Sequence, residues 1–423
     1  MKTGWREVSV REILQLEYGK PLDDSYRKPN GRFPVYGANG EKDRTDKFYY
    51  DKPSIIIGRK GSAGEINLTE TKFWPLDVTY FVKFDEHQHD LRFIYYLLKT
   101  LELTKLAKGV KPGINRDEVY SLVTRVPPFA EQQRIVGILD ETFDSIATVK
   151  ANAEKNLINA RDLFQSVLFQ AVIGKTTKEW RETMRTGKTS ADFDFKELLR
   201  QIAATDRKSG RTQDTTGHEA VTSIIPEEWR HTSIEQLFNL IDYRGKTALK
   251  SNVGRRLITA RNIKMGFLSD EPVAFISEEQ YKKWMVRGFP KPGDILFVTE
   301  GHTMGFVALN TRDDDFALAQ RTITLQPPVP FNTKYFFYFM LSAHFQNLVK
   351  LNATGAAAVG MKASKFRSLP LAFPSFAEQS IIVDKLDTMD QETRHLNAIY
   401  QKKIAALDVL KKALLDQAFS GQL

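Results

Sequence analysis

Two stretches of the chain carry apolar residues at alternating spacings of four and three, the pattern of a coiled-coil seam. One runs from Ile135 to Val167 and the other from Ile382 to Leu414, each for about five heptads. The main seam positions are Ile135, Leu139, Ile146 and Leu163 in the first stretch and Ile382, Leu386, Leu396 and Leu410 in the second. We expect two helices, each about 60 Å long at 1.5 Å per residue, that pack antiparallel.

Both predicted helices have defined ends and an ambiguous middle. Prolines precede them, and Glu131 and Glu378 lie in their first turns, where the helix dipole favours a carboxylate. The same seam position holds Asn156 in one helix and Lys403 in the other. These polar residues either fix the register of the pair at a cost in stability, or the seam drifts there to Leu157 and Ile404.

The chain is an internal repeat. The tetrapeptide Phe-Ala-Glu-Gln at 129–132 returns at 376–379, an offset of 247, and this offset holds from Gly113 with Gly360 to Gly174 with Gly421. Trp5-Arg6 resembles Trp229-Arg230 at an offset of 224, so the second copy carries about 23 extra residues. One register shared over such a length indicates a duplicated unit rather than two similar amphipathic helices.

We therefore predict two α/β (α+β) domains separated by two long antiparallel coiled-coil helices, with a pseudo-twofold repeat. Within the domains we expect helices at 91–106 and 335–348. A short amphipathic helix around 195–202 and a flexible loop at 208–219 are expected in the linker. The predicted bounds are 1–128 for the first domain, 129–174 for the first helix, 175–228 for a polar linker, 229–375 for the second domain and 376–423 for the second helix.

Composition narrows the possible functions. The 423 residues include no cysteine, which excludes disulfides, cysteine zinc sites and thiol nucleophiles. No apolar run is long enough for a signal peptide core or a membrane span, so the expected compartment is the cytoplasm. A net charge of +9 favours an anionic partner weakly.

Motifs for catalysis are missing. Gly-Lys-Thr occurs at 174–176, 187–189 and 245–247, but a phosphate-binding loop needs a glycine five positions earlier, where Phe169, Glu182 and Leu240 stand. The Asn/Asp-Pro-Pro-aromatic tetrapeptide of amino-methyltransferases is absent. His87-Gln88-His89-Asp90 has metal-like spacing, but its charged surroundings favour a solvated surface. We expect no catalytic residue and no metal site.

If the anionic partner is a nucleic acid such as DNA, basic, glycine-rich loops are the best candidates to contact it, because Lys, Arg, hydroxyls and backbone amides bind phosphates while Arg, Asn and Gln read base edges. The alternative for each is a solvated turn that contacts nothing. The candidates in the first domain are Arg59, Lys60, Ser62, Lys108, Lys111, Asn115 and Arg116. Those in the second are Arg261, Asn262, His302, Thr303, Lys362 and Lys365.

Taken together, these segments resemble the specificity subunits of type I restriction-modification systems over nearly the whole chain. The resemblance rests on the twice-used Pro-x-aromatic-Ala-Glu-Gln helix start and on Gln170 to Lys175 followed by Glu179-Trp180-Arg181. It rests also on Pro34 to Gly40 and on Ile225 to Trp229. The resemblance implies two target-recognition domains, each reading half of a split DNA site, with the helices setting the gap.

The resemblance also implies partners and cofactors. Two modification (methyltransferase) subunits would bind along the helices, and restriction (motor-nuclease) subunits would join the complex. S-adenosylmethionine would belong to the modification subunits, and ATP with magnesium to the restriction subunits, so this chain would bind none of them. The alternatives are a coiled-coil tether without DNA specificity and an enzyme with a coiled-coil insertion, the latter disfavoured by the missing motifs.

Overall fold

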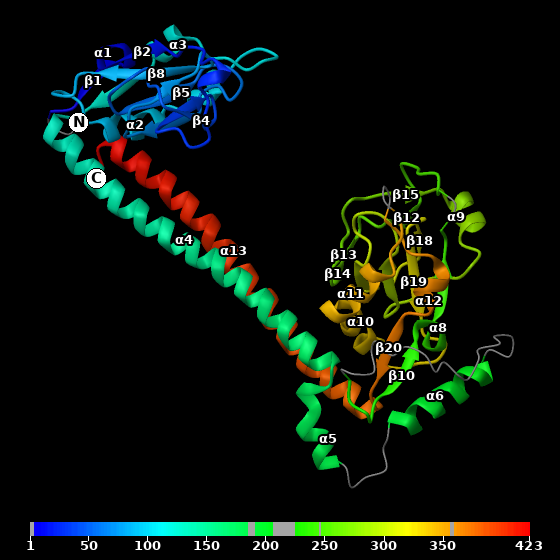
Figure 1. Cartoon of the computed structure of the whole chain (residues 1–423). Helices are drawn as coiled ribbons and strands as arrows, with labels where there is room; N and C mark the ends of the chain where they lie inside the picture. The colour runs from blue at the N-terminus through cyan, green and yellow to red at the C-terminus, as the bar shows by residue number, and fades with distance from the viewer. Residues whose placement is uncertain (1–3, 185–190, 206–224, 245–246, 356–358) are drawn as a thin grey trace. The chain divides into compact units, whose positions relative to one another are not determined.

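The computed structural model describes residues 4–184, 191–205, 225–244, 247–355 and 359–423. The Gly-Lys-Thr triplets at 187–189 and 245–247 and the expected loop at 208–219 lie wholly or partly outside these residues. The chain forms two compact units, Met1–Asn156 with Ile399–Leu423, and Leu157–Ala398 (Figure 1). Each unit holds one globular domain and one half of each long helix.

The first domain is built on sheets whose strands pair antiparallel, with the exception of one parallel pair. Strand β1 (Arg6–Ser9) pairs with β9 (Val123–Val126). The main sheet has the order β2 (Leu14–Tyr18), β8 (Thr79–Phe84), β5 (Ser54–Gly58), β6 (Ile66–Thr69). A smaller sheet has the order β4 (Gly40–Thr45), β3 (Phe33–Gly37), β7 (Trp74–Pro75).

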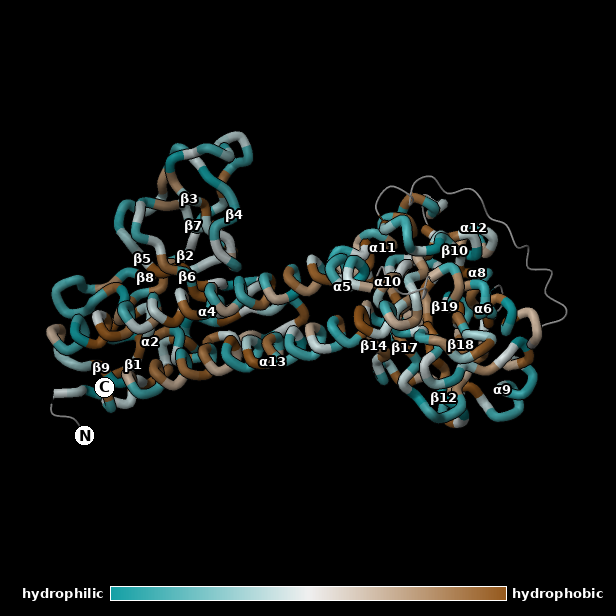
Figure 2. Tube along the Cα trace, turned by 90° about the horizontal axis from the view of Figure 1, so that it is seen from below, coloured by the Kyte–Doolittle hydropathy of each residue, from teal (hydrophilic) through white to brown (hydrophobic). Residues whose placement is uncertain are grey.

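Strand β5 separates two cores because every one of its side chains is buried. Ile55 and Ile57 belong to the core that includes helix α2 (Leu91–Thr100). Ile56 belongs to a cluster with Phe73 and Phe81, as expected when successive strand residues point to opposite faces. The small sheet accordingly lies on the side of the main sheet opposite α2 (Figure 2).

Short helices complete this domain: η1 (Asp24–Tyr26), α1 (Val10–Ile13), η2 (Leu103–Leu106) and α3 (Arg116–Tyr120). The single helix expected at 91–106 is wrong, because α2 ends at Thr100 and Glu102 takes a left-handed conformation with φ 48°. The turn buries Leu103 and brings the backbone of Thr104 so close to Gly64 that a Cβ there would lie 2.4 Å from the Thr104 nitrogen.

The second domain repeats this construction. Strand β10 (Arg230–Ser233) pairs with β20 (Pro370–Phe373). The main sheet has the order β11 (Asn239–Asp242), β19 (Thr322–Gln326), β16 (Ile295–Val298), β17 (Val307–Leu309), as in the first domain. The additional strands are β15 (Phe275–Ile276), β12 (Arg255–Ile258) and β18 (Phe316–Leu318) in one sheet and β13 (Ile263–Lys264) and β14 (Phe267–Leu268) in another. The shared order and pairing confirm the internal repeat.

The helices of the second unit differ from the predicted ones at one place. They are η3 (Lys175–Thr177), α5 (Lys178–Met184), α6 (Ala191–Thr205), α8 (Ile234–Leu237), α9 (Glu278–Trp284), α10 (Thr333–Leu341), α11 (Ala343–Leu351) and α12 (Ala363–Arg367). The aromatic helix expected at 335–348 is two helices, because Ser342 is extended and its hydroxyl caps α11 at Phe345. The break lets Phe339 and Phe345 both be fully buried.

The expected linker helix is present as α6, where Phe195, Leu198 and Ile202 are buried. Phe195 packs edge-on against Phe373 of β20, with ring centroids 5.2 Å apart. Asp194 accepts a hydrogen bond of 2.8 Å from the backbone nitrogen of Phe376. The helix therefore docks on the second domain where its long helix begins.

Helices α4 (Phe129–Val172) and α13 (Phe376–Ser420) run antiparallel within each unit. In the first unit, Ala418 is buried in the same core as Ile135 and Leu139, and Lys150 pairs with Asp408 at 2.7 Å. In the second, Ala171 is buried in the same core as Ile382 and Leu386. Because Ala171 and Ala418 are equivalent in the repeat, each unit contains the same contact between the two long helices.

Five of the eight main seam residues are buried: Ile135, Leu139, Ile146, Ile382 and Leu386. Leu163, Leu396 and Leu410 are 57%, 40% and 46% exposed, and at these positions the expected seam is wrong. A straight α-helix drifts by about 20° per heptad from a seven-residue repeat, so the buried face moves to neighbours such as Phe164 and Leu168. Leu157 and Ile404 are likewise half-buried where Asn156 and Lys403 are exposed, as the drifting seam requires.

A carboxylate on each long helix holds the adjacent domain helix. Asp140 of α4 accepts hydrogen bonds from Arg92 at 2.7 Å and from the Tyr96 hydroxyl. Asp387 of α13, its equivalent in the repeat, accepts from Lys334 and from the Tyr338 hydroxyl, both at 2.6 Å. Burial, followed by the hydrogen bond to the carboxylate, raises the pKa of both phenols, so they remain donors.

A second, buried carboxylate holds three segments together in the second unit. Glu378 of α13 forms an ion pair with Arg181 of α5 and accepts from Thr177 at 2.6 Å and from the Trp229 indole at 2.8 Å. Its burial is offset by these donors, since an unpaired carboxylate in this environment would cost several kcal/mol. Glu378 therefore fixes the start of α13 against both the linker and the second domain.

We expect Asp387→Ala to lower the free energy of unfolding of the second unit by about 1–3 kcal/mol, because the hydroxyl of the buried Tyr338 loses its acceptor. Asp384→Ala, three residues away at an exposed position, is the matched control. Urea unfolding of both variants measures the difference as a shift in midpoint. Equal midpoints would show that the Asp387 contact contributes nothing.

Candidate nucleic-acid interface

The two basic loops singled out in the first domain form one surface. The loop after β5 and the segment 108–116 are joined by hydrogen bonds from Gly61 N to Pro112 O at 2.8 Å and from Ile114 N to Arg59 O at 3.1 Å. A Cβ on Gly58 would lie 2.1 Å from the Ser62 carbonyl oxygen, so the tight turn of the first loop requires glycine. The structure thus brings Arg59 and Lys60 together with the segment that carries Lys111.

Tyr18, at the end of β2, is the centre of a cationic cluster beside these loops. Its ring is 46% exposed, and the guanidinium groups of Arg59 and Arg116 lie 5.3 Å and 5.2 Å from its centroid. Arg59 also donates to the Asp77 carbonyl at 2.7 Å, which fixes its position. Tyr18 was missed from the sequence, because only the tertiary contact with Arg59 and Arg116 distinguishes it from other strand tyrosines.

Tyr80 supports the same cluster by packing against Tyr18. Its ring contacts Tyr18 with centroids 5.1 Å apart, and its hydroxyl donates to the Ile114 carbonyl at 3.4 Å. Burial, with a smaller effect from Tyr18, raises the pKa of Tyr80 to about 12, so its phenol keeps the proton that it donates. The segment 108–116 is therefore anchored at its C-terminal end.

The remaining candidates of the first domain differ in their surroundings. Lys60, Ser62 and Lys111 are exposed. Lys108 is also exposed but forms an ion pair with Glu118. The Asn115 side chain caps α3 by accepting from Asp117 N at 2.9 Å, so its carbonyl oxygen already has a structural role.

The second domain builds an equivalent corner. Gly301 N donates to Val359 O at 2.8 Å, and Met361 N donates to Thr299 O at 3.0 Å, which joins the loop after β16 to residues 359–361. His302 is exposed and Thr303 half-exposed on that loop. Lys362 and Lys365 are exposed on the segment that follows Met361. Four candidates therefore belong to one pair of joined segments.

Arg244, which the sequence did not single out, reaches this corner from the end of β11. Its guanidinium group donates to the Asp242 carboxylate at 2.7 Å and to the Met361 carbonyl at 2.9 Å. Arg244 thus follows the strand equivalent to β2, close to the place where the first domain has Tyr18.

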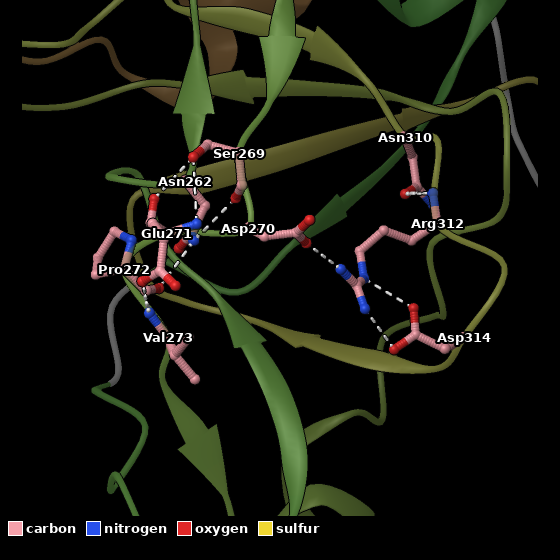
Figure 3. A network of polar contacts seen from close by, with 9 residues as sticks. All are labelled: Asn262, Ser269, Asp270, Glu271, Pro272, Val273, Asn310, Arg312 and Asp314. Carbon is pink, nitrogen blue, oxygen red and sulfur yellow. Dashed lines mark hydrogen bonds and ion pairs between the residues drawn. The ribbon is translucent and has the colours of Figure 1, made fainter.

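Asn262 is a wrong prediction. It is completely buried, accepts from the Thr259 backbone and hydroxyl, and donates to the carbonyls of Ser269 and Pro272 at 3.1 Å and 3.0 Å. Figure 3 shows this side chain enclosed by the turn, while the neighbouring Asp270 reaches toward Arg312. Asn262 therefore holds the turn between β12 and β15 rather than facing a ligand. Arg261 is exposed on the same turn.

A second exposed feature of the first domain combines aromatic rings with lysines. Tyr26, Phe48 and Tyr49 are 44%, 44% and 36% exposed. The ammonium groups of Lys47, Lys72 and Lys20 lie 3.2 Å, 4.7 Å and 5.2 Å from these rings, respectively. Aromatic faces beside cations are suited to nucleobases and phosphates. The residues come from separate loops, so the sequence alone does not reveal the patch.

Motifs that suggested other chemistry have structural explanations. Gly174, in the first Gly-Lys-Thr triplet, has φ 73° and ends α4. Asp90, the last residue of the segment 87–90 with metal-like spacing, caps α2 by accepting hydrogen bonds from Arg92 N and Phe93 N. Within the described ranges, no three His, Asp or Glu residues are grouped as a metal site would require. No helix in that part of the chain is sufficiently long and apolar to cross a membrane.

Comparison with known proteins agrees with this arrangement. The family model described as "Type I restriction modification DNA specificity domain" matches residues 2–160 and 226–405. The chain is 25% identical over 180 residues to the EcoDI specificity subunit of Escherichia coli, covering 42% of this chain and 40% of that protein. It is 23% identical over 357 residues to the EcoBI specificity subunit of the same species, covering 81% and 68%.

A solved structure supports the fold. A chain from a study of complex assembly and conformational transition of the type I R-M system aligns with a TM-score of 0.69 at 15% identity, covering 100% of this chain and 99% of that one. Because the family model matches both copies of the repeat and well over half of the residues, this chain belongs to the family defined by the type I restriction modification DNA specificity domain.

Proposed function

We propose that the chain is the sequence-specific DNA-recognition subunit of a type I restriction-modification complex. Each globular domain reads one half of a bipartite target, and the helical pair sets the spacing and binds the modification subunits. The observation that carries the proposal is the repeated corner, in which a glycine loop after β5 or β16 is bonded to a second loop that precedes the long helix. The scaffold is the same in both domains, while the exposed side chains differ, as two readers of different half-sites require.

The chain has no catalytic role of its own in this proposal. It binds double-stranded DNA and two modification (methyltransferase) subunits, and restriction (motor-nuclease) subunits join through the complex. S-adenosylmethionine is bound by the modification subunits, and ATP with magnesium by the restriction subunits. The alternative, a coiled-coil tether without DNA specificity, offers no reason for cations and aromatic rings to surround the loops of the first domain.

The decisive experiment maps methylated positions across a genome by long-read sequencing, with and without this chain expressed beside its modification subunit. We expect a two-part motif with a constant unread gap that appears only with the chain. Replacing residues 1–128 by the equivalent domain of a relative should change one half of the motif alone. A motif that does not depend on the chain would favour the tether.

The spacing role makes a separate prediction. Inserting seven residues after Asn156 and seven after Gln401 lengthens each helix by about 10 Å while preserving the heptad pattern. Since base pairs are about 3.4 Å apart, the unread gap should grow by about three base pairs with both half-sites unchanged. Methylome mapping of this variant measures the gap, and an unaltered gap would refute the spacing role.

Binding of phosphates by the exposed lysines predicts a salt-dependent effect. Changing Lys60, Lys108 and Lys111 together to glutamine should weaken DNA binding by the assembled complex. It should also reduce the slope of log affinity against log salt by about 0.9 for every phosphate that these lysines neutralise. Lys105→Gln in the same domain is the control. A slope equal to that of the unchanged complex would place these lysines away from the DNA.

A further inference from the structure

The segment 108–113 is a closed hairpin, a feature that its sequence did not indicate. Lys108 and Gly113 exchange two backbone hydrogen bonds, each of 3.0 Å, and Gly109 at the turn has φ 92°. Because Gly61 N also bonds to Pro112 O, the hairpin is braced against the loop after β5. Four residues, 109–112, therefore project from a rigid base.

The second domain has an equivalent pair of closing bonds. Thr354 and Gly360 exchange two backbone hydrogen bonds, each of 2.9 Å, and Gly301 N donates to Val359 O. Gly113 and Gly360 are equivalent in the repeat, so the closing residue is the same in both domains. The braced base of the first hairpin therefore has a counterpart in the second domain.

Val110 forms the tip of the first hairpin and is fully exposed. Single exposed valines are common on protein surfaces, but this one stands between Lys108 and Lys111 on a braced turn. Lys111 is exposed beside the valine and Lys108 is held at the base of the turn by Glu118, so positive charge flanks a side chain that offers neither a hydrogen-bond donor nor an acceptor. A base contact made by this valine would therefore be apolar.

Building on the DNA-recognition function proposed above, we propose that the hairpin 108–113 enters the major groove of the first half-site and that Val110 contacts a thymine methyl group. The thymine methyl is the apolar group that base edges present in the major groove. Side chains that instead wedge between base pairs from the minor groove are mostly longer, such as Phe, Leu, Ile or Met. The short, branched valine fits a methyl contact better.

The test uses the complete chain assembled with its modification subunits and a synthetic duplex carrying the target found by methylome mapping. Each thymine of the first half-site is replaced in turn by deoxyuridine, which removes only the 5-methyl group. We expect one position at which affinity falls about fourfold, the value of one buried methyl group. Deoxyuridine in the second half-site should change the affinity by the same factor whether Val110 is present or substituted.

Val110→Ser removes both methyl groups of the side chain and makes it polar. We expect this variant to bind the thymine duplex about as weakly as the unchanged chain binds the deoxyuridine duplex, and to lose its sensitivity to the methyl group. Val253→Ser, at an exposed valine of the second domain, is the matched control. Equal melting temperatures for the variants confirm that the fold is intact.

The outcomes separate this inference from the proposed function. If a bipartite target exists but no thymine shows a methyl effect that depends on Val110, or if the half-site has no A·T pair, the thymine contact is wrong while DNA recognition stands. A Val110 effect of equal size on thymine and deoxyuridine duplexes also overturns it, and indicates a wedge or a sugar contact. Failure of the proposed function itself would appear as the absence of any bipartite target.

Discussion

The burial of one apolar stripe between α4 and α13 is the constraint on which the rest of the structure depends. Neither helix can leave Ile135, Leu139, Ile382 and Leu386 in water, and burying a side chain of this size contributes roughly 1.5–3 kcal/mol. Antiparallel pairing satisfies both copies at once, because Ala418 covers the first pair and Ala171 the second. The small alanine side chain at both positions allows close packing of the two helices.

Polar contacts attach the globular domains to the two long helices. Asp140 and Asp387 hold α2 and α10 through one cation and one phenol each, and Glu378 holds the linker and the start of the second domain. These carboxylates lie on the long helices, whereas the donors lie on the domains. Each domain is therefore oriented on the helical halves in its own unit, and its loops acquire a defined position from them.

The two domains combine a common scaffold with different surfaces. Their main sheets share strand order, and in both domains an equivalent glycine, Gly113 or Gly360, closes a backbone pairing beside the loop after β5 or β16. Near that pairing the first domain has Tyr18, Arg59 and Arg116, while the second has Arg244, His302 and Lys362. Such a division allows the side chains that face a ligand to change without loss of the core that positions them.

Much of the architecture could be predicted because its signals are local or periodic. A heptad pattern, a repeated tetrapeptide and a shared offset of 247 residues are visible in a single sequence, and they indicated the duplicated unit, the long helices and the basic loops. Errors arose where small angular drifts accumulate, as at Leu163, or where one capping residue ends a helix, as at Ser342.

The sequence by itself determined the repeat and the antiparallel helices, and it indicated the basic loops that we propose as DNA contacts. Only the tertiary structure decided which polar side chains are available to a ligand. The Asn262 side chain is hydrogen-bonded within a turn and the Asn115 carbonyl oxygen caps a helix, while Tyr18 lies beside two guanidinium groups. The physical reason is that a polar group's role depends on which donors, acceptors and charges surround it. Those neighbours often come from distant segments, such as Arg116 beside Tyr18, which only folding brings together.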